Sequence, residues 1–239
     1  MLSKDQEKLL NDIHSRVIEY LSDIDIKPNK TEKEIRSKID LSIGKRSDLS
    51  QIKVLFDKYL EHSTKTNSPK FFNQLFSGFS TTSYMGEILS IITNNSMYTY
   101  EMSPVATIIE IELLNKMSGL IGYENGGGTF VPGGSSGNFL AMLAARHYRM
   151  PAVMNSGLFG VSPMTIFVSK DCHYSMIKSA NQLGIGTDNI IKVDVDKAGK
   201  MIPDALDHAI QSSLNIGSTP FFVGATAGTT VRGCFDPIQ

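Results

Sequence analysis

Cysteine is scarce in this chain, which also lacks long apolar runs and an excess of charge of one sign. Cys172 and Cys234 are the only two cysteines in 239 residues. They are too few and too isolated for a disulfide framework or a zinc site, so we expect reduced thiols and no metal. The 23 basic and 24 acidic residues leave a net charge of -1, which argues against nucleic acid and anionic membranes as partners. No apolar run approaches the roughly 18 residues that span a bilayer.

The N-terminus lacks the apolar core of a signal peptide, because Lys4, Asp5, Glu7 and Lys8 already carry charge. Together with the reduced thiols, this predicts a cytoplasmic protein. The composition, 41% hydrophobic and 20% charged, is ordinary for a globular domain. A chain of this length can bury a large core, either as one domain or as one domain with a helical extension.

The N-terminal quarter predicts helices without strands. Capping residues open three helices at Ser3, Thr31 and Asp48. Each helix carries an apolar face, and three helices alone cannot build a large core. We therefore predict that residues 1–65 form an arm that packs on another surface, for which a second copy of the chain is one candidate.

Beyond a polar linker (62–69) and two further helical patterns (84–93 and 104–118), strands and helices alternate. Short apolar runs predict strands, and amphipathic segments between them predict helices. The strands are MTIFVS (164–169), NIIKVDV (189–195) and PFFVGAT (220–226), and the helices are YSMIKSANQLG (174–184) and PDALDHAIQSSL (203–214). This order predicts an α/β fold with a mainly parallel sheet, in which ligands bind beyond the carboxyl ends of the strands.

The stretch GGGTFVPGGSSGNFLAMLAARHYR (126–149) predicts a short strand, a glycine and serine turn, and a helix. Basic residues crowd the last helical turn, and Pro151 follows. Unpaired N–H groups and the positive end of the helix dipole would face whatever lies over the turn. The sequence therefore predicts an anion site, with phosphate as its usual occupant.

The same turn also matches G-x-S-x-G, with Ser135 at the nucleophile position of an α/β-hydrolase. Such an enzyme needs an acid and then a histidine later in the chain. Only His173 and His208 follow, and His208 lies in an ordinary amphipathic helix, whereas His173 comes too early for an acid to precede it. A serine hydrolase is therefore the less favoured alternative.

Three further side chains are candidates for ligand contact. His173 follows a predicted strand directly, and Thr226 ends another. A lone histidine is more often structural, but a position at the carboxyl end of a strand favours function. Gln74 lies in the apolar segment FFNQLFSG, where it is either a hydrogen-bonded core amide or an amide that faces a ligand.

Five segments, in order and spacing, resemble the group II pyridoxal-phosphate-dependent amino-acid decarboxylases. The likeness is greatest to the branch with glutamate, cysteine sulfinate and aspartate 1-decarboxylases. The segments are FFNQLFSG (71–78), MYTYEMSP (97–104), FVPGGSSGN (130–138), SKDCHYSMIKSANQLGIGTDN (169–189) and PFFVGATAGTTVRGCFDP (220–237). The resemblance implies a fold-type I, aminotransferase-like large domain, pyridoxal 5'-phosphate as cofactor, a small acidic L-amino acid as substrate, and a homodimer with swapped N-terminal arms.

Carried over by position, the resemblance implies that Gly134 and Ser135 hold the cofactor phosphate. It implies that His173 stacks on the pyridine ring as a catalytic residue and that Thr226 lies beside the ring. Gly137 stands where the family more often has Ser, and we expect a loosened turn there.

For the substrate, the resemblance implies that Gln74 contacts the carboxylate. At position 76, animal glutamate decarboxylases usually have Ser, whereas this chain has Phe76. In this it resembles the cysteine sulfinate branch, which also has Phe. A bulky apolar side chain there favours an acidic substrate shorter than glutamate.

The family's Schiff-base lysine and the aspartate that pairs with the pyridine nitrogen are expected beyond Gln239. None of the lysines here stands in the family's Asn-Pro-His-Lys context. We therefore interpret residues 66–239 as the front part of the cofactor-binding domain and expect the 239-residue chain alone to be inactive. The alternative is a non-catalytic protein that keeps the fold, such as a partner subunit.

Overall fold

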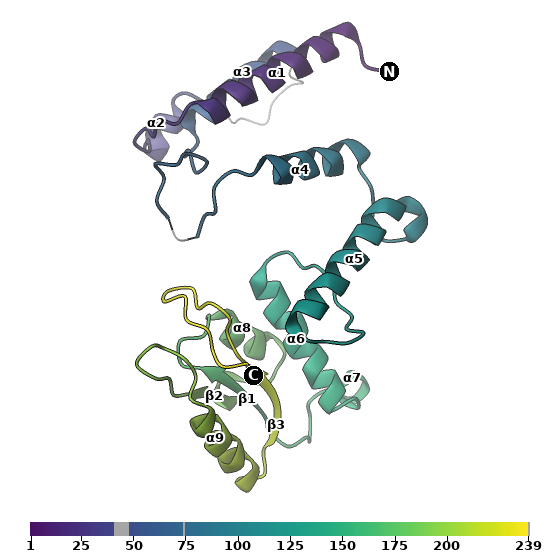
Figure 1. Ribbon diagram of the computed structural model, residues 1–239, viewed down its shortest axis with the longest axis vertical. Coiled ribbons are helices and arrows are strands. Elements are labelled where there is room, and N and C mark those ends of the chain that lie inside the picture. Colours follow the sequence, from purple (N-terminus) through teal and green to yellow (C-terminus); the bar gives the residue numbers. More distant parts are fainter. Residues whose placement is uncertain (41–47, 74, 239) are drawn as a thin grey trace. The chain divides into compact units, whose positions relative to one another are not determined.

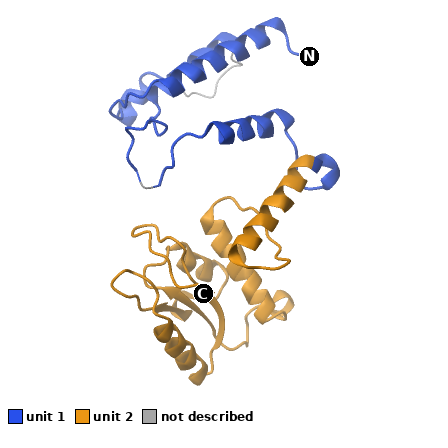
Figure 2. Ribbon diagram, in the orientation of Figure 1, with its two compact units in different colours: residues 1–104 blue, residues 105–239 orange. Residues whose placement is uncertain are grey.

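The computed structural model describes residues 1–40, 48–73 and 75–238. The chain forms two compact units, Met1–Pro104 and Val105–Gln239, which are coloured separately in Figure 2. The predicted division into an arm of residues 1–65 and a cofactor domain of residues 66–239 stays a prediction. Among the described residues, no helix is both long enough and apolar enough to cross a membrane.

The first unit is helical, as predicted. Its elements are α1 (Lys4–Ser22), α2 (Glu32–Arg36), α3 (Leu49–His62), α4 (Thr81–Thr93) and the 3-10 helix η1 (Tyr100–Met102) (Figure 1). The predicted capping residues Ser3, Thr31 and Asp48 are the N-caps of α1, α2 and α3, and each forms a capping box. Helices α1 and α3 pack together and carry ion pairs between Arg16 and Asp57 and between Lys53 and Asp12, at 3.1 and 3.2 Å.

These first three helices contain no buried residue. Leu10 and Ile18 on α1 remain 53% and 52% exposed, and Tyr59 on α3 remains 70% exposed. Pairing α1 with α3 therefore leaves much of their apolar surface uncovered within the described part of the chain, as the sequence pattern predicts.

The second unit contains the sheet. Its helices are α5 (Pro104–Ile121, which begins at the unit boundary), α6 (Gly134–Arg149), α7 (Val153–Ser156), α8 (Ser175–Gln182), α9 (Pro203–Asn215) and the 3-10 helix η2 (Thr187–Asn189). Its strands are β1 (Met164–Ser169), β2 (Ile190–Val193) and β3 (Thr219–Gly224) (Figure 1). The strand order is β2-β1-β3, and both pairings are parallel, which confirms the predicted α/β class.

The two connections between these strands run in opposite directions across the sheet. From β1 the chain moves through α8 to β2, and from β2 it returns through α9 past β1 to β3. Right-handed crossovers in opposite directions place their helices on opposite faces. The core agrees: Ile166 and Val168 pack with Met142 of α6 and with α8, whereas Phe167 packs with residues of α9.

Two details differ from the predictions. The expected strand before the glycine turn does not form, because residues 126–132 find no partner strand among the described residues, and an extended segment needs one. Helix α5 also continues past Gly119 and ends at Ile121; Gly122 follows, and its φ of +86° suits a residue without a Cβ.

Met142 tests the packing of α6 on the sheet. It is fully buried in the cluster with Ile166 and Val168. Met142→Ala should lower the free energy of unfolding by about 2–5 kcal/mol, because it leaves a cavity in the core. On the same helix, Leu140 is 39% exposed, and Leu140→Ala should cost about 1 kcal/mol or less. Urea denaturation measures both; equal losses would contradict this packing.

Candidate functional site

The turn before α6 leaves backbone donors open. Gly133 has a φ of +90°, and its carbonyl accepts the N–H groups of Ser136 and Gly137 at 3.1 and 3.2 Å. The N–H groups of Gly134 and Ser135 find no acceptor among the described residues, and both residues are exposed. Two open donors at the positive end of a 16-residue helix fit a phosphate.

The loosened turn expected at Gly137 stays a prediction. Gly137 lies inside α6, and a Cβ added to it would come within 3.3 Å of Val131 Cγ2. A residue without a side chain therefore lets the helix pass close to the segment before the turn.

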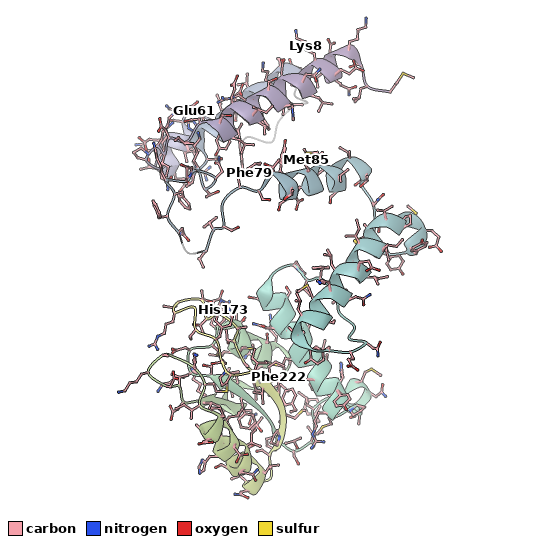
Figure 3. The ribbon with its side chains drawn as sticks, in the orientation of Figure 1. Lys8, Glu61, Phe79, Met85, His173 and Phe222 are labelled. Carbon is pink, nitrogen blue, oxygen red and sulfur yellow. The ribbon has the colours of Figure 1, made fainter. Side chains whose placement is uncertain are left out.

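His173 lies in the loop after β1, where Figure 3 labels it among the loops that follow the strands. Its Nδ1 accepts the backbone N–H of Ser175 at 3.2 Å and lies 2.8 Å from Ser175 Oγ. Its ring centroid lies 4.3 Å from that of Tyr174. The half-buried imidazole is therefore held at its Nδ1 side by the start of α8.

A hydrogen bond from Asn138 links this loop to α6. Asn138 Nδ2 donates to Ser175 Oγ at 2.8 Å, across 37 residues of sequence. Ser175 is only 2% exposed, so water competes little for this contact. Asn138 lies one helical turn beyond Gly134, and the contact therefore ties the anion turn to His173.

Thr226 follows β3 and is held by a buried carboxylate. Asp236, 4% exposed, accepts the N–H of Thr226 at Oδ2 at 2.8 Å and the N–H of Met201 at Oδ1 at 2.7 Å. The N–H of Asp236 donates in turn to the carbonyl of Thr226 at 2.9 Å. Since Met201 belongs to the core beneath α9, Asp236 anchors the Thr226 loop to the sheet.

Cys172 and Asp171 precede His173 in the same loop and differ in charge and in contacts. Burial raises the pKa of the Cys172 thiol, which packs against the core and so stays protonated at neutral pH. Asp171 Oδ2 lies 3.3 Å from Arg232 Nη1 without the geometry of a hydrogen bond, and this ion pair connects the loops after β1 and β3. The partly exposed pair contributes little stability.

The structure thus brings together the turn at Gly134 and Ser135 with His173, while Thr226 follows the strand next to β1. Gln74 lies outside the described residues. Phe76 is 54% exposed in the first unit and packs edge-on against Phe71, with ring centroids 5.5 Å apart.

Sequence reasoning assigned no role to Asn138, Ser175 or Asp236. Their partners are remote in sequence or belong to the backbone. The only sequence signal was their presence in the segments GGSSGN, HYS and FDP.

A serine hydrolase would need a histidine side chain hydrogen-bonded to the hydroxyl of Ser135. Among the described residues, the Ser135 hydroxyl has no histidine partner, and the nitrogen of His173 that would face an acid in a triad, Nδ1, contacts Ser175 and no carboxylate. The geometry therefore favours an anion-binding role for this turn over a nucleophilic one.

Asp236 gives a test of the anchored loop. Asp236→Asn should lower the free energy of unfolding by about 1–3 kcal/mol, because an amide cannot accept two N–H groups on separate oxygens and one buried donor loses its partner. Asp207→Asn, exposed on α9, is the matched control and should change stability by less than about 0.5 kcal/mol. Thermal and urea unfolding measure both variants; a neutral Asp236→Asn would argue against the anchor.

Known proteins resemble this chain in sequence and in structure. The sequence profile of the "Pyridoxal-dependent decarboxylase conserved domain" matches residues 30–239. Cysteine sulfinic acid decarboxylase of Mus musculus is 42% identical over 211 residues, which are 88% of this chain and 43% of that protein. An acidic amino acid decarboxylase of Bos taurus is 46% identical over 180 residues, 75% of this chain and 34% of that protein.

A crystal structure of mouse CSAD superposes on 97% of this chain and on 50% of its own chain, with a TM-score of 0.92 and 39% identity. The chain therefore spans about half the length of such relatives. The predicted aminotransferase-like fold agrees with this match. On the extent of the profile match and these identities, the chain belongs to the pyridoxal-dependent decarboxylase family.

Proposed function

We propose that the complete protein removes the α-carboxylate from a small acidic L-amino acid, with glutamate, aspartate and cysteine sulfinate as the candidates. The observation that carries this proposal is the identity with a cysteine sulfinic acid decarboxylase over most of the chain. The likeness to an acidic amino acid decarboxylase supports the same substrate class.

In this proposal the open donors of Gly134 and Ser135 hold the phosphate of pyridoxal 5'-phosphate at the start of α6. His173 packs on the ring, and Thr226 lies beside it. When bound, the cofactor supplies an electron sink for the charge that remains on the substrate carbon as carbon dioxide leaves. The side chains of this chain bind and orient the cofactor, so that the bond to be broken is correctly placed.

Substitutions at Gly134 can separate the effect of a negative charge on cofactor binding from an effect on the stability of the fold. A Cβ there meets nothing within 4 Å, and a carboxylate at a helix N-terminus favours the helix. In the complete protein, Gly134→Asp should therefore retain stability but bind pyridoxal phosphate at least about tenfold more weakly than the isosteric, neutral Gly134→Asn, through repulsion of the phosphate. Cofactor titration followed by absorbance measures this difference. Equal affinities of the two variants for pyridoxal phosphate would contradict binding of the cofactor phosphate at this turn.

Substrate choice is proposed to depend on Gln74, as the contact to the substrate carboxylate, and on Phe76. An exposed phenyl group that packs against Phe71 in its own unit is available to meet a substrate. Its bulk would leave less room for a glutamate side chain than serine would, which supports a shorter acidic substrate.

In the complete protein, Phe76→Ser should raise the ratio of kcat/KM for glutamate over cysteine sulfinate by about tenfold, since the smaller side chain opens space for one more methylene. Phe72→Ser, at a neighbouring phenylalanine that is 92% exposed, should leave the ratio unchanged. Release of carbon dioxide from each amino acid provides the measurement. An unchanged ratio in Phe76→Ser would refute the role of Phe76, and no release from any of the three acids would refute the proposed activity.

We also propose a homodimer in which the N-terminal arms, residues 1–65, exchange between subunits. The exposed apolar side chains of α1 and α3 support this arrangement, because a partner would cover them. A cytoplasmic location stays a prediction from the sequence.

A second candidate is a non-catalytic protein of the same fold that pairs with a complete subunit. The two candidates differ in whether the complete protein contains a lysine in the Asn-Pro-His-Lys context, which only the enzyme requires. For the 239-residue chain alone, borohydride treatment with pyridoxal phosphate should give no specific adduct at Lys170 or Lys178, the lysines that flank His173.

A further inference from the structure

The contacts around His173 form a chain of hydrogen bonds with a fixed direction. Asn138 Nδ2 can only donate, so Ser175 Oγ accepts from it at 2.8 Å. The hydroxyl proton of Ser175 is then available to His173 Nδ1, also 2.8 Å away.

The backbone sets the same direction at the imidazole. The Ser175 N–H points at His173 Nδ1 from 3.2 Å, and a backbone N–H cannot accept. Nδ1 must therefore present its lone pair to both Ser175 donors, and the proton of the neutral ring lies on Nε2. No described residue accepts a hydrogen bond from Nε2.

We propose that Ser175 and Asn138 are positioning residues that hold the His173 ring through Nδ1 and keep its proton on Nε2, the ring donor left open to a ligand. The significance for catalysis rests on the proposed function, in which His173 packs on the cofactor. Because Asn138 belongs to α6, these hydrogen bonds also fix the position of the imidazole relative to the turn at Gly134 and Ser135.

A purely structural role for these contacts would be helix capping. The N-cap residue of α8, Tyr174, makes no side-chain cap, and His173 Nδ1 accepts an N–H from the first turn in its place. Capping requires only this backbone bond. It does not require the Ser175 hydroxyl or Asn138, so substitution of those two groups separates the two roles.

The test uses the 239-residue chain without cofactor, labelled with ¹⁵N, and reads the tautomer of each imidazole from long-range ¹H–¹⁵N spectra at a pH where the rings are neutral. His173→Gln assigns the signals. The wild-type ring should carry its proton on Nε2. Ser175→Ala and Asn138→Asp should each move the tautomer ratio about fivefold toward Nδ1–H, as expected for loss of one hydrogen bond.

Asn138→Asp is the sharper variant, because it leaves Ser175 in place and adds no volume. The new carboxylate accepts the Ser175 hydroxyl proton and so withdraws it from Nδ1. Ser179→Ala, at an equally buried serine of α8, is the matched control and should leave the ratio unchanged.

An unchanged ratio in Asn138→Asp would overturn the proposal and leave His173 as a cap of α8. An equal change in Ser179→Ala would also overturn it. If Ser175→Ala does not fold, Asn138→Asp decides alone. Since no cofactor is present, failure of pyridoxal phosphate binding elsewhere would leave this result intact, and the two proposals fail separately.

Discussion

Strand β1 is buried along its whole length, and each of its faces needs a helix to cover it. Met142 of α6 and the helix α8 meet one face, while α9 meets the other. Neighbouring strands pair with both of its edges. The loops that carry His173 and Thr226 leave this sheet at the carboxyl ends of β1 and β3, so the candidate site depends on how β1 is enclosed.

Buried polar groups connect that core to the site. The carboxylate of Asp236 accepts hydrogen bonds from the backbone N–H groups of Met201 and Thr226. The hydroxyl of Ser175 accepts a hydrogen bond from Asn138, which lies on another helix. Each of these groups would be costly if left unpaired, which makes the loops hold one arrangement. These hydrogen bonds hold the backbone of the two loops at Ser175 and at Thr226.

Most elements of the second unit could be predicted from the sequence because their signals are local. Buried runs predicted the strands to within about two residues, a normal uncertainty in element boundaries. In the first unit, capping residues likewise marked the starts of α1, α2 and α3. The strand expected before Gly133 was wrong, since pairing depends on a neighbour that the local pattern does not reveal. The contacts of Asn138 and Asp236 were missed for a similar reason: tertiary packing, not periodicity, brings their partners close.

The central place of β1 also has a consequence for synthesis. In chain order β1 is followed by β2, and β3 comes only after α9. A growing chain can therefore pair one edge of β1 while the other, later occupied by β3, still displays unpaired N–H and C=O groups. During that interval the apolar strand is a template for pairing with other nascent chains, so the yield of folded protein depends on how quickly β3 emerges and docks.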